Sequence, residues 1–144
     1  MIEYVVGFLC DESRVVLIEK KRPSWQAGKL NGVGGKIEPG ETPHEAMQRE
    51  FLEEAGLNIN NWELGVVMSG STWKMSGKTV GPRWKVYFFS AYGPTSGAQT
   101  QTDEIIWIAS RSTILSEKVI PNLRWLIPLC LDPTVSRPVN IQSA

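Results

Sequence analysis

The sequence predicts an α/β domain in which helices pack on a mixed β-sheet. Short apolar segments typical of strands recur along the chain, one segment carries the start and stop signals of a helix, and strands are expected on both sides of it. With 144 residues, 42% hydrophobic and 21% charged, the chain has the composition of a globular protein. Because no repeat or linker divides it, we expect one domain over 1–144, ending in a tail or strap over 133–144.

Strand signals begin near the N-terminus. Segments 4–10 and 14–20 are rich in Val, Ile, Leu and Phe, and the turn residues between them predict a β-hairpin. The glycine-rich segment 23–40 predicts a long loop, a feature that is usually functional in a compact domain. The elements expected later are strands over 62–69, 84–91 and 105–109, a basic loop over 74–83, a helical turn over 112–115, and a helix over 122–131 that contains Pro128.

The strongest helix signal covers 43–55. Thr42 is a suitable N-cap, Pro43 fits the first helical position, and Glu45 completes a capping box with Thr42. Gly56 supplies the left-handed conformation that ends many helices. Both ends of this helix are therefore predicted from local chemistry.

This helix concentrates carboxylates on one side. Glu50, Glu53 and Glu54 fall within a sector of about 100°, beside an apolar stripe that would face the core. Three such carboxylates repel one another and, near a helix C-terminus, oppose the helix dipole. One explanation is a solvated acidic face; the other is a site for Mg²⁺ or Mn²⁺, which prefer oxygen ligands. Arg49 either forms helix salt bridges with Glu45 and Glu53 or orients a metal-binding glutamate.

Charge and composition exclude several classes of protein. The 15 basic and 15 acidic residues give zero net charge, which excludes binding of a nucleic acid polymer through a general basic field. The signs are segregated, however, with five bases against one acid over 14–29 and six acids against two bases over 36–54. There is no recognisable signal peptide or membrane span, and Cys10 and Cys130 are expected as buried thiols, so we expect a cytoplasmic protein.

The loop before the helix does not match two common phosphate-binding motifs, but together with the helix it matches a third sequence pattern. Ile37 stands where a dinucleotide-binding motif needs its third glycine, and a P-loop would need Gly in place of Leu30 and Ser or Thr in place of Ile37. From Gly35 to Leu57 the chain instead reads Gly-x5-Glu-x7-Arg-Glu-Phe-x-Glu-Glu-x-Gly-Leu. This pattern resembles the Nudix box, with an aromatic residue where an aliphatic one is usual.

The Nudix resemblance implies a three-layer α/β/α sandwich that hydrolyses a nucleoside diphosphate linked to another moiety. In that family Glu50, Glu53 and Glu54 would hold Mg²⁺, or Mn²⁺, together with a backbone carbonyl near Gly35. The metal would neutralise phosphate charge and lower the pKa of the attacking water. Arg49 would orient the glutamates. The catalytic role in such a site therefore falls on Glu53, Glu54 and Arg49.

A resemblance to MutT-like nucleoside triphosphatases, which clear oxidised purine nucleotides, extends past the box. It implies that Asn31 reads the base through an amide that carries both donors and an acceptor. Glu104 matches a distal carboxylate that is a further catalytic candidate, as metal ligand or general base. The animal members of this group recognise the oxidised purine with a Trp and two Asp residues. In this sequence the matching positions hold Ile120, Asn122 and Leu123. The candidate substrate-binding residues are Asn31, Lys20, Arg22, Lys36, Asn122 and Trp84.

Six tryptophans are many for a chain of this length. An indole in a loop can stack on a base, and the three expected in or beside loops are Trp25, Trp73 and Trp84. The three expected to pack in the core are Trp62, Trp107 and Trp125.

The predicted function is Mg²⁺-dependent hydrolysis of a nucleoside triphosphate to the monophosphate and pyrophosphate, with oxidised purines as the favoured bases. The protein would be a monomer or homodimer that binds a small nucleotide and neither a nucleic acid polymer nor a membrane. One alternative keeps the family and changes the substrate to a nucleotide sugar, a dinucleoside polyphosphate or a modified pyrimidine nucleotide. The other is a nucleotide sensor without turnover, against which the complete glutamate set argues.

Overall fold

The structure, a computed structural model, describes residues 1–75 and 78–143, although not the side chains within 72–80. Its elements in chain order are β1 (Ile2–Cys10), β2 (Arg14–Glu19), the 3-10 helix η1 (Ser24–Gln26), β3 (Leu30–Asn31), β4 (Val33–Lys36), α1 (Pro43–Ala55), β5 (Glu63–Met75), β6 (Lys78–Tyr92), β7 (Ile105–Ser110), the 3-10 helix η2 (Arg111–Leu115), α2 (Leu123–Leu131) and β8 (Val139–Gln142).

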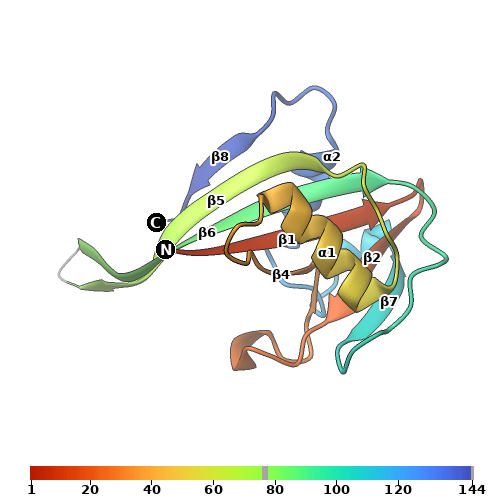
Figure 1. Cartoon of the computed structure of the whole chain (residues 1–144), viewed down its shortest axis with the longest axis horizontal. Coiled ribbons are helices and arrows are strands. Elements are labelled where there is room, and N and C mark those ends of the chain that lie inside the picture. The colour runs from red at the N-terminus through yellow and green to blue at the C-terminus, as the bar shows by residue number, and fades with distance from the viewer. Residues whose placement is uncertain (76–77, 144) are drawn as a thin grey trace.

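One mixed sheet organises these elements (Figure 1). The strands follow the order β3-β2-β1-β6-β5-β8, while β4 pairs with β1 and β7 pairs with β2. The β1–β6 and β5–β8 pairs are parallel and the others are antiparallel. The sheet is therefore mixed, as predicted.

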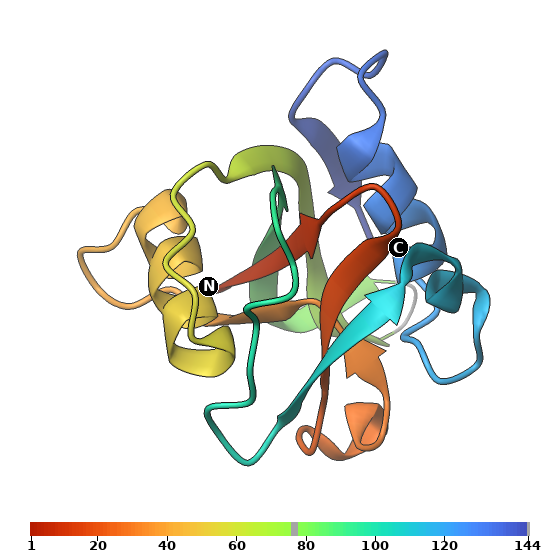
Figure 2. The same ribbon diagram turned by 90° about the vertical axis from the view of Figure 1, so that its right-hand side faces the viewer.

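A helix covers each face of the sheet, which gives the predicted α/β/α sandwich (Figure 2). Successive side chains of a strand point to opposite faces, so neighbouring residues of β6 serve two different cores. Phe89 packs in the cluster of α1 with Met47 and Phe51, all of them fully buried. Phe88 packs in the cluster of α2 with Leu126. We refer below to these two surfaces as the α1 face and the α2 face.

The boundaries of α1 are those predicted from the sequence. The N–H of Glu45 donates to Thr42 Oγ1 at 3.1 Å, and the N–H of Thr42 donates back to the Glu45 carboxylate at 3.0 Å. Gly56 ends the helix with a φ of 74°, which favours glycine. Glu45 is engaged in this cap and does not form the salt bridge with Arg49 that its spacing suggested. The ion-pair partners of Arg49 are other glutamates, described below. The cap fixes the start of the helix that carries the acidic residues.

Three segments predicted as irregular are strands instead. Within the expected loop 23–40, β3 and β4 pair with β2 and β1. The described parts of the expected loop 74–83, residues 74–75 and 78–83, belong to the paired strands β5 and β6, because ladder hydrogen bonds require no apolar pattern. The expected tail 133–144 contains β8, which pairs with β5. Conversely, the predicted hairpin of β1 and β2 shows a paired register only at Cys10 and Val15. The side chains of Trp73, Lys74 and Lys78 lie outside the described residues.

Two tryptophans predicted to be buried are exposed. Trp62 is buried as expected, but Trp107 and Trp125 are 40% and 45% exposed. Trp107 lies on β7, where the Lys118 ammonium covers its ring at 5.4 Å. Trp125 lies roughly 160° around the helix from the buried Leu123, so α2 presents it to solvent. Composition alone could not assign either residue to a face.

Two further predictions from the sequence concern the two cysteines and the apolar character of the helices. Cys10 and Cys130 are buried free thiols, as predicted. Among the described residues, no helix has the length and apolar character needed to cross a membrane.

Candidate active site

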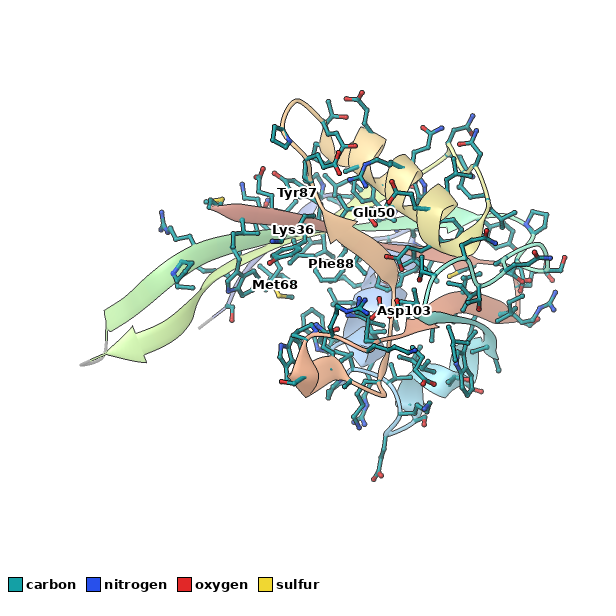
Figure 3. All side chains as sticks on the ribbon, turned by 60° about the horizontal axis from the view of Figure 1, so that its bottom comes forward. Lys36, Glu50, Met68, Tyr87, Phe88 and Asp103 are labelled. Atoms are coloured by element: carbon teal, nitrogen blue, oxygen red, sulfur yellow. The ribbon has the colours of Figure 1, made fainter. Side chains whose placement is uncertain are left out.

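Glu50 is the innermost carboxylate of α1 and projects toward β4 (Figure 3). The residue is 8% exposed. A Cβ placed on Gly35 would lie 2.5 to 2.7 Å from the carboxylate atoms of Glu50, which is shorter than real contacts allow. Glycine at this position therefore leaves the space that the carboxylate occupies. Burial raises the pKa of Glu50, against the opposing effect of the Arg49 guanidinium.

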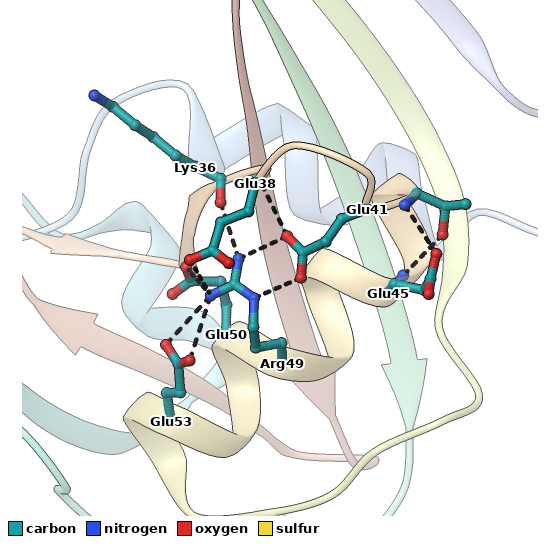
Figure 4. Close-up of polar contacts among 8 residues, drawn as sticks. Lys36, Glu38, Glu41, Glu45, Arg49, Glu50 and Glu53 are labelled. Carbon is teal, nitrogen blue, oxygen red and sulfur yellow. Dashed lines mark hydrogen bonds and ion pairs between the residues drawn. The ribbon is translucent and has the colours of Figure 1, made fainter.

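Arg49 connects the preceding loop to the acidic helix (Figure 4). Its Nε and Nη2 donate to the two oxygens of Glu41 at 2.6 and 2.9 Å. Its Nη1 donates to Glu50 at 2.9 Å and to Glu53 at 3.3 Å, while Nη2 also donates to the Lys36 carbonyl at 3.0 Å. The sequence suggested either salt bridges or an orienting role, and the contacts combine both. One guanidinium thus sets the positions of two glutamates relative to β4.

Glu54 is a half-buried acid with one buried, unsatisfied oxygen. Its Oε2 is buried and has no hydrogen-bond partner among the residues that the structure describes. Burial raises the pKa of Glu54 from its ordinary 4.5 to about 7; the Lys20 ammonium opposes this shift, and the charges of Glu50 and Glu104 add to it. A buried carboxylate oxygen without a partner is costly, and a bound cation would remove that cost.

Ionisation of Glu54 should make the metal-free protein less stable as pH rises. Because its pKa is raised in the folded state, the folded protein binds more protons than the unfolded chain between about pH 4.5 and 7, so the free energy of unfolding falls across that window. Glu54→Gln removes this term. In EDTA, its stability relative to wild type should therefore increase with pH, by on the order of 2 kcal/mol at pH 8. Urea denaturation at a series of pH values measures the difference.

The control for this experiment is Glu12→Gln, which removes an exposed carboxylate from the turn between β1 and β2. Its stability should follow that of wild type across the same pH range. A constant offset between Glu54→Gln and wild type from pH 4 to 8 would contradict the assignment of this titration to Glu54.

Glu104 faces α1 from the segment before β7 and is held by the end of β2. The residue is 4% exposed, and its two oxygens accept from Lys20 Nζ at 2.9 Å and from the N–H of Lys21 at 2.7 Å. Burial alone would raise the pKa of Glu104, but these hydrogen bonds hold it below its ordinary value. Arg22 forms an exposed ion pair with Asp103 beside it. Lys20 and Arg22, predicted to bind substrate, thus lie next to the carboxylates.

Two other predicted substrate-binding side chains do not join this cluster. The Lys36 side chain is exposed and points away from Arg49, and only its carbonyl takes part (Figure 4). Trp84 shares the α2 face with Phe88, on the other side of the sheet from α1. Trp84 also lines a cavity of about 340 Å³ together with Gly70 and Gln142.

Asn31 lies on β3 at the edge of the sheet, where it pairs with Ile18 of β2. The N–H of Gly32 donates to its Oδ1 at 2.8 Å, and its Nδ2 donates to Gln26 Oε1 at 3.0 Å. Gly32 passes close to the side chains of Val6 and Phe8, since a Cβ there would lie 2.6 Å from both. Gln26 belongs to no motif, so sequence analysis gave no reason to select it.

The three residues at the altered base-reading positions differ in burial. Ile120 and Leu123 are buried in the core of the α2 face, while Asn122 is half-buried at the start of α2. The N–H of Ile120 donates to the carbonyl of Leu30, which places this segment beside Asn31. Asn122 is therefore the polar side chain of the three that remains available near the β3 edge.

The residues present fit a hard divalent cation by their chemistry. Glu50, Glu53 and Glu54 supply carboxylate oxygens, and β4 supplies the Gly35 carbonyl. Two observations favour such a group: the unpartnered Oε2 of Glu54 and the glycine-lined space that receives Glu50. Among the described residues, however, no three His, Cys, Asp or Glu side chains already converge tightly enough to hold an ion. A metal would thus have to draw the carboxylates together.

The α/β/α layers and the glutamate-rich helix define a single class of domain. Residues 3–124 match the NUDIX domain family, so the chain belongs to the Nudix family, as its motif predicted. Its similarity to solved structures supports the same fold. A MutT protein from Bacillus halodurans aligns over 100% of this chain and 91% of its own, with a TM-score of 0.75 and 21% identity.

Sequence relatives share shorter segments with this chain. It is 42% identical over 57 residues to the mouse oxidized purine nucleoside triphosphate hydrolase, covering 40% of this chain and 36% of that protein. It is 36% identical over 64 residues to the 8-oxo-dGTP diphosphatase of Escherichia coli, covering 44% and 50%. The zebrafish oxidized purine nucleoside triphosphate hydrolase is 49% identical over 45 residues, covering 31% and 29%. The matches thus span about a third to a half of these relatives.

Proposed function

We propose that this protein is a Mg²⁺-dependent pyrophosphohydrolase that converts a nucleoside triphosphate to the monophosphate and pyrophosphate, with oxidised purine nucleotides as its preferred substrates. The observation that carries this proposal is the buried Oε2 of Glu54, which has no partner among the described residues, with Lys20 and Glu104 among the charged neighbours of this side chain. The named activities of the mouse and Escherichia coli relatives support the choice of base.

Each element of the acidic cluster has a part in this proposal. Glu50, Glu53, Glu54 and the Gly35 carbonyl would hold Mg²⁺. The bound ion would neutralise phosphate charge and lower the pKa of the attacking water. Arg49 keeps Glu50 and Glu53 in place through its contacts with both.

Proton transfer and phosphate binding involve the groups around Glu54. We assign the role of proton acceptor to Glu54, because its Oε2 has no hydrogen-bond partner among the described residues. Glu104 is less suited, because both its oxygens already accept hydrogen bonds. Lys20 and Arg22 supply the cationic groups that would meet the phosphates. Their present carboxylate partners hold them beside the site.

The base would lie at the β3 edge of the sheet beside Asn31, where Gly32 passes over Val6 and Phe8 of the α2 face. Val6, Met68 and Val86 are half-buried apolar residues of that face, and Figure 3 shows Met68 and Phe88 on the side of the sheet away from α1. Such side chains can pack on the plane of a base while Asn31 and Asn122 meet its polar edge. The Asn31 amide offers both hydrogen-bonding functions for this purpose.

A panel of nucleotides with Mg²⁺ tests the proposal, with pyrophosphate release and monophosphate formation as the measurement. The panel contains 8-oxo-dGTP, dGTP, CTP, a nucleotide sugar, a dinucleoside polyphosphate and ADP-ribose. We expect the highest kcat/KM for 8-oxo-dGTP and pyrophosphate as its product. Preferred cleavage of another member would contradict the substrate assignment. Tight nucleotide binding without any turnover would contradict the enzymatic function.

A further inference from the structure

We infer that Gln26 determines base specificity by fixing the orientation of the Asn31 amide, an inference that rests on the proposed function. Gln26 would not react with the nucleotide. It is a positioning residue whose effect passes through Asn31. Three features of the structure support this role: the contacts that occupy part of the Asn31 amide, the backbone hydrogen bonds that hold Gln26, and the donor and acceptor that remain free on Asn31.

The contacts of Asn31 leave its amide one orientation. Oδ1 accepts from the N–H of Gly32 at 2.8 Å, and Nδ2 donates to Gln26 Oε1 at 3.0 Å. If the amide rotated by 180°, its nitrogen would face the Gly32 N–H and its oxygen would face the Gln26 carbonyl oxygen. Both contacts would then set like groups against each other. The backbone N–H of Gly32 sets which end of the amide is the oxygen, and Gln26 Oε1 holds the Nδ2 end in place.

Gln26 is held by backbone hydrogen bonds on both sides. Its N–H donates to the carbonyl of Pro23 at 2.9 Å, and its carbonyl accepts from Lys29 at 2.8 Å. The surrounding loop is closed at its base, where the N–H of Lys20 donates to Lys29 and the N–H of Gly28 donates to Lys20, both at 2.8 Å. Gln26 and Asn31 are each half-buried. The acceptor that faces Asn31 thus comes from a well-connected turn.

The fixed amide offers a definite pattern to a ligand. An asparagine amide has two N–H donors and two acceptor lone pairs, and Gln26 and Gly32 each use one of them. One donor and one acceptor remain, side by side. Guanine presents two acceptors, O6 and N7, along its major-groove edge. Oxidation at C8 places a proton on N7, so the same edge then carries an acceptor beside a donor. The fixed amide complements the oxidised edge and mismatches the ordinary one.

Two substitutions of Gln26 separate its hydrogen bond from its size. Gln26→Met keeps the length of the side chain but removes the acceptor, whereas Gln26→Glu keeps an acceptor for Asn31. The measurement is the ratio of kcat/KM for 8-oxo-dGTP to kcat/KM for dGTP, with kcat and KM determined separately. We expect Gln26→Met to lower this ratio about tenfold, mainly through KM, because an amide no longer held at its Nδ2 end loses about one hydrogen bond to the oxidised base. Gln26→Glu should keep the ratio within about threefold of wild type.

A second glutamine–asparagine pair provides a matched control. Gln48 donates through Nε2 to Asn58 Oδ1 at 2.8 Å on the outer surface of α1. Gln48→Met removes a similar amide contact away from the α2 face, and its ratio should equal that of wild type. Melting temperatures of all variants show whether each folds.

The outcomes separate this inference from the function on which it rests. A wild-type protein that hydrolyses neither nucleotide would overturn the proposed function, and the inference with it. If wild type prefers 8-oxo-dGTP and a folded Gln26→Met keeps that preference, only the inference is overturned. It is also overturned if Gln26→Met lowers kcat/KM equally for both nucleotides, or if Gln26→Glu loses the preference as fully as Gln26→Met.

Discussion

Hydrolysis by Glu54→Gln should be about 100-fold slower than by wild type, or slower still, while the protein remains folded. The substitution preserves the size of the side chain and removes the charge that would bind a cation and the basic site that would accept a proton. It also removes the cost of a buried carboxylate, so the variant should be at least as stable as wild type above pH 7. The measurement is kcat for pyrophosphate release at saturating Mg²⁺.

Metal binding provides a second measurement for the same variant. Added Mg²⁺ should raise the melting temperature of wild type, because a ligand of the folded state stabilises it. Glu54→Gln should show a much smaller increase, and Glu12→Gln should behave like wild type. Activity above about a tenth of wild type in Glu54→Gln, or a full response to Mg²⁺, would place the essential carboxylate elsewhere.

Gly35→Ala should produce a folded protein that has lost most of its Mg²⁺ response and about 100-fold in activity. The added methyl group would lie 2.5 to 2.7 Å from the Glu50 carboxylate. That carboxylate is the end of a flexible side chain, so it can move aside at modest cost in stability. Once displaced, however, it no longer lies between β4 and α1, where the Gly35 carbonyl is available. The expected loss is therefore in function, measured by Mg²⁺ titration of activity and of melting temperature.

The control for this prediction is Gly93→Ala, which makes the same chemical change where the nearest atom is 3.9 Å away. Its activity and Mg²⁺ response should match those of wild type. The double variant Gly35→Ala with Glu50→Asp adds a second comparison, because the shorter acid leaves room for the methyl group. A Gly35→Ala protein with wild-type Mg²⁺ affinity would show that Glu50 does not need its position against β4.

The acidic helix was predictable because its signals are local. Thr42, Pro43, Glu45 and Gly56 fix the ends of α1 through contacts within a few residues, and the structure places them as predicted. The carboxylates share one face because the helix period fixes their angles. The spacing from Gly35 to Leu57 also sufficed to predict the family, and the match over 3–124 confirms it.

The exposure of several side chains depended on contacts that no local pattern encodes. Trp107 and Trp125 are aromatic residues in apolar segments, yet they are 40% and 45% exposed. Lys36 follows the glycines of the box, but its side chain points away from Arg49 and its carbonyl makes the contact. Strands β5 and β6 include the described residues of a basic segment, because pairing with a neighbouring strand stabilises a strand that has no apolar pattern.

By itself, the sequence determined the fold class, the bounds of the acidic helix and the family, because these depend on spacing along the chain. Only the tertiary structure decided which side chains from distant parts of the chain contact one another. It brought Glu104 to Lys20, left an oxygen of Glu54 unpartnered, and placed Gln26 against the Asn31 amide. Burial and pairing between distant segments produce those relations, and they set the pKa of Glu54 and the orientation of Asn31.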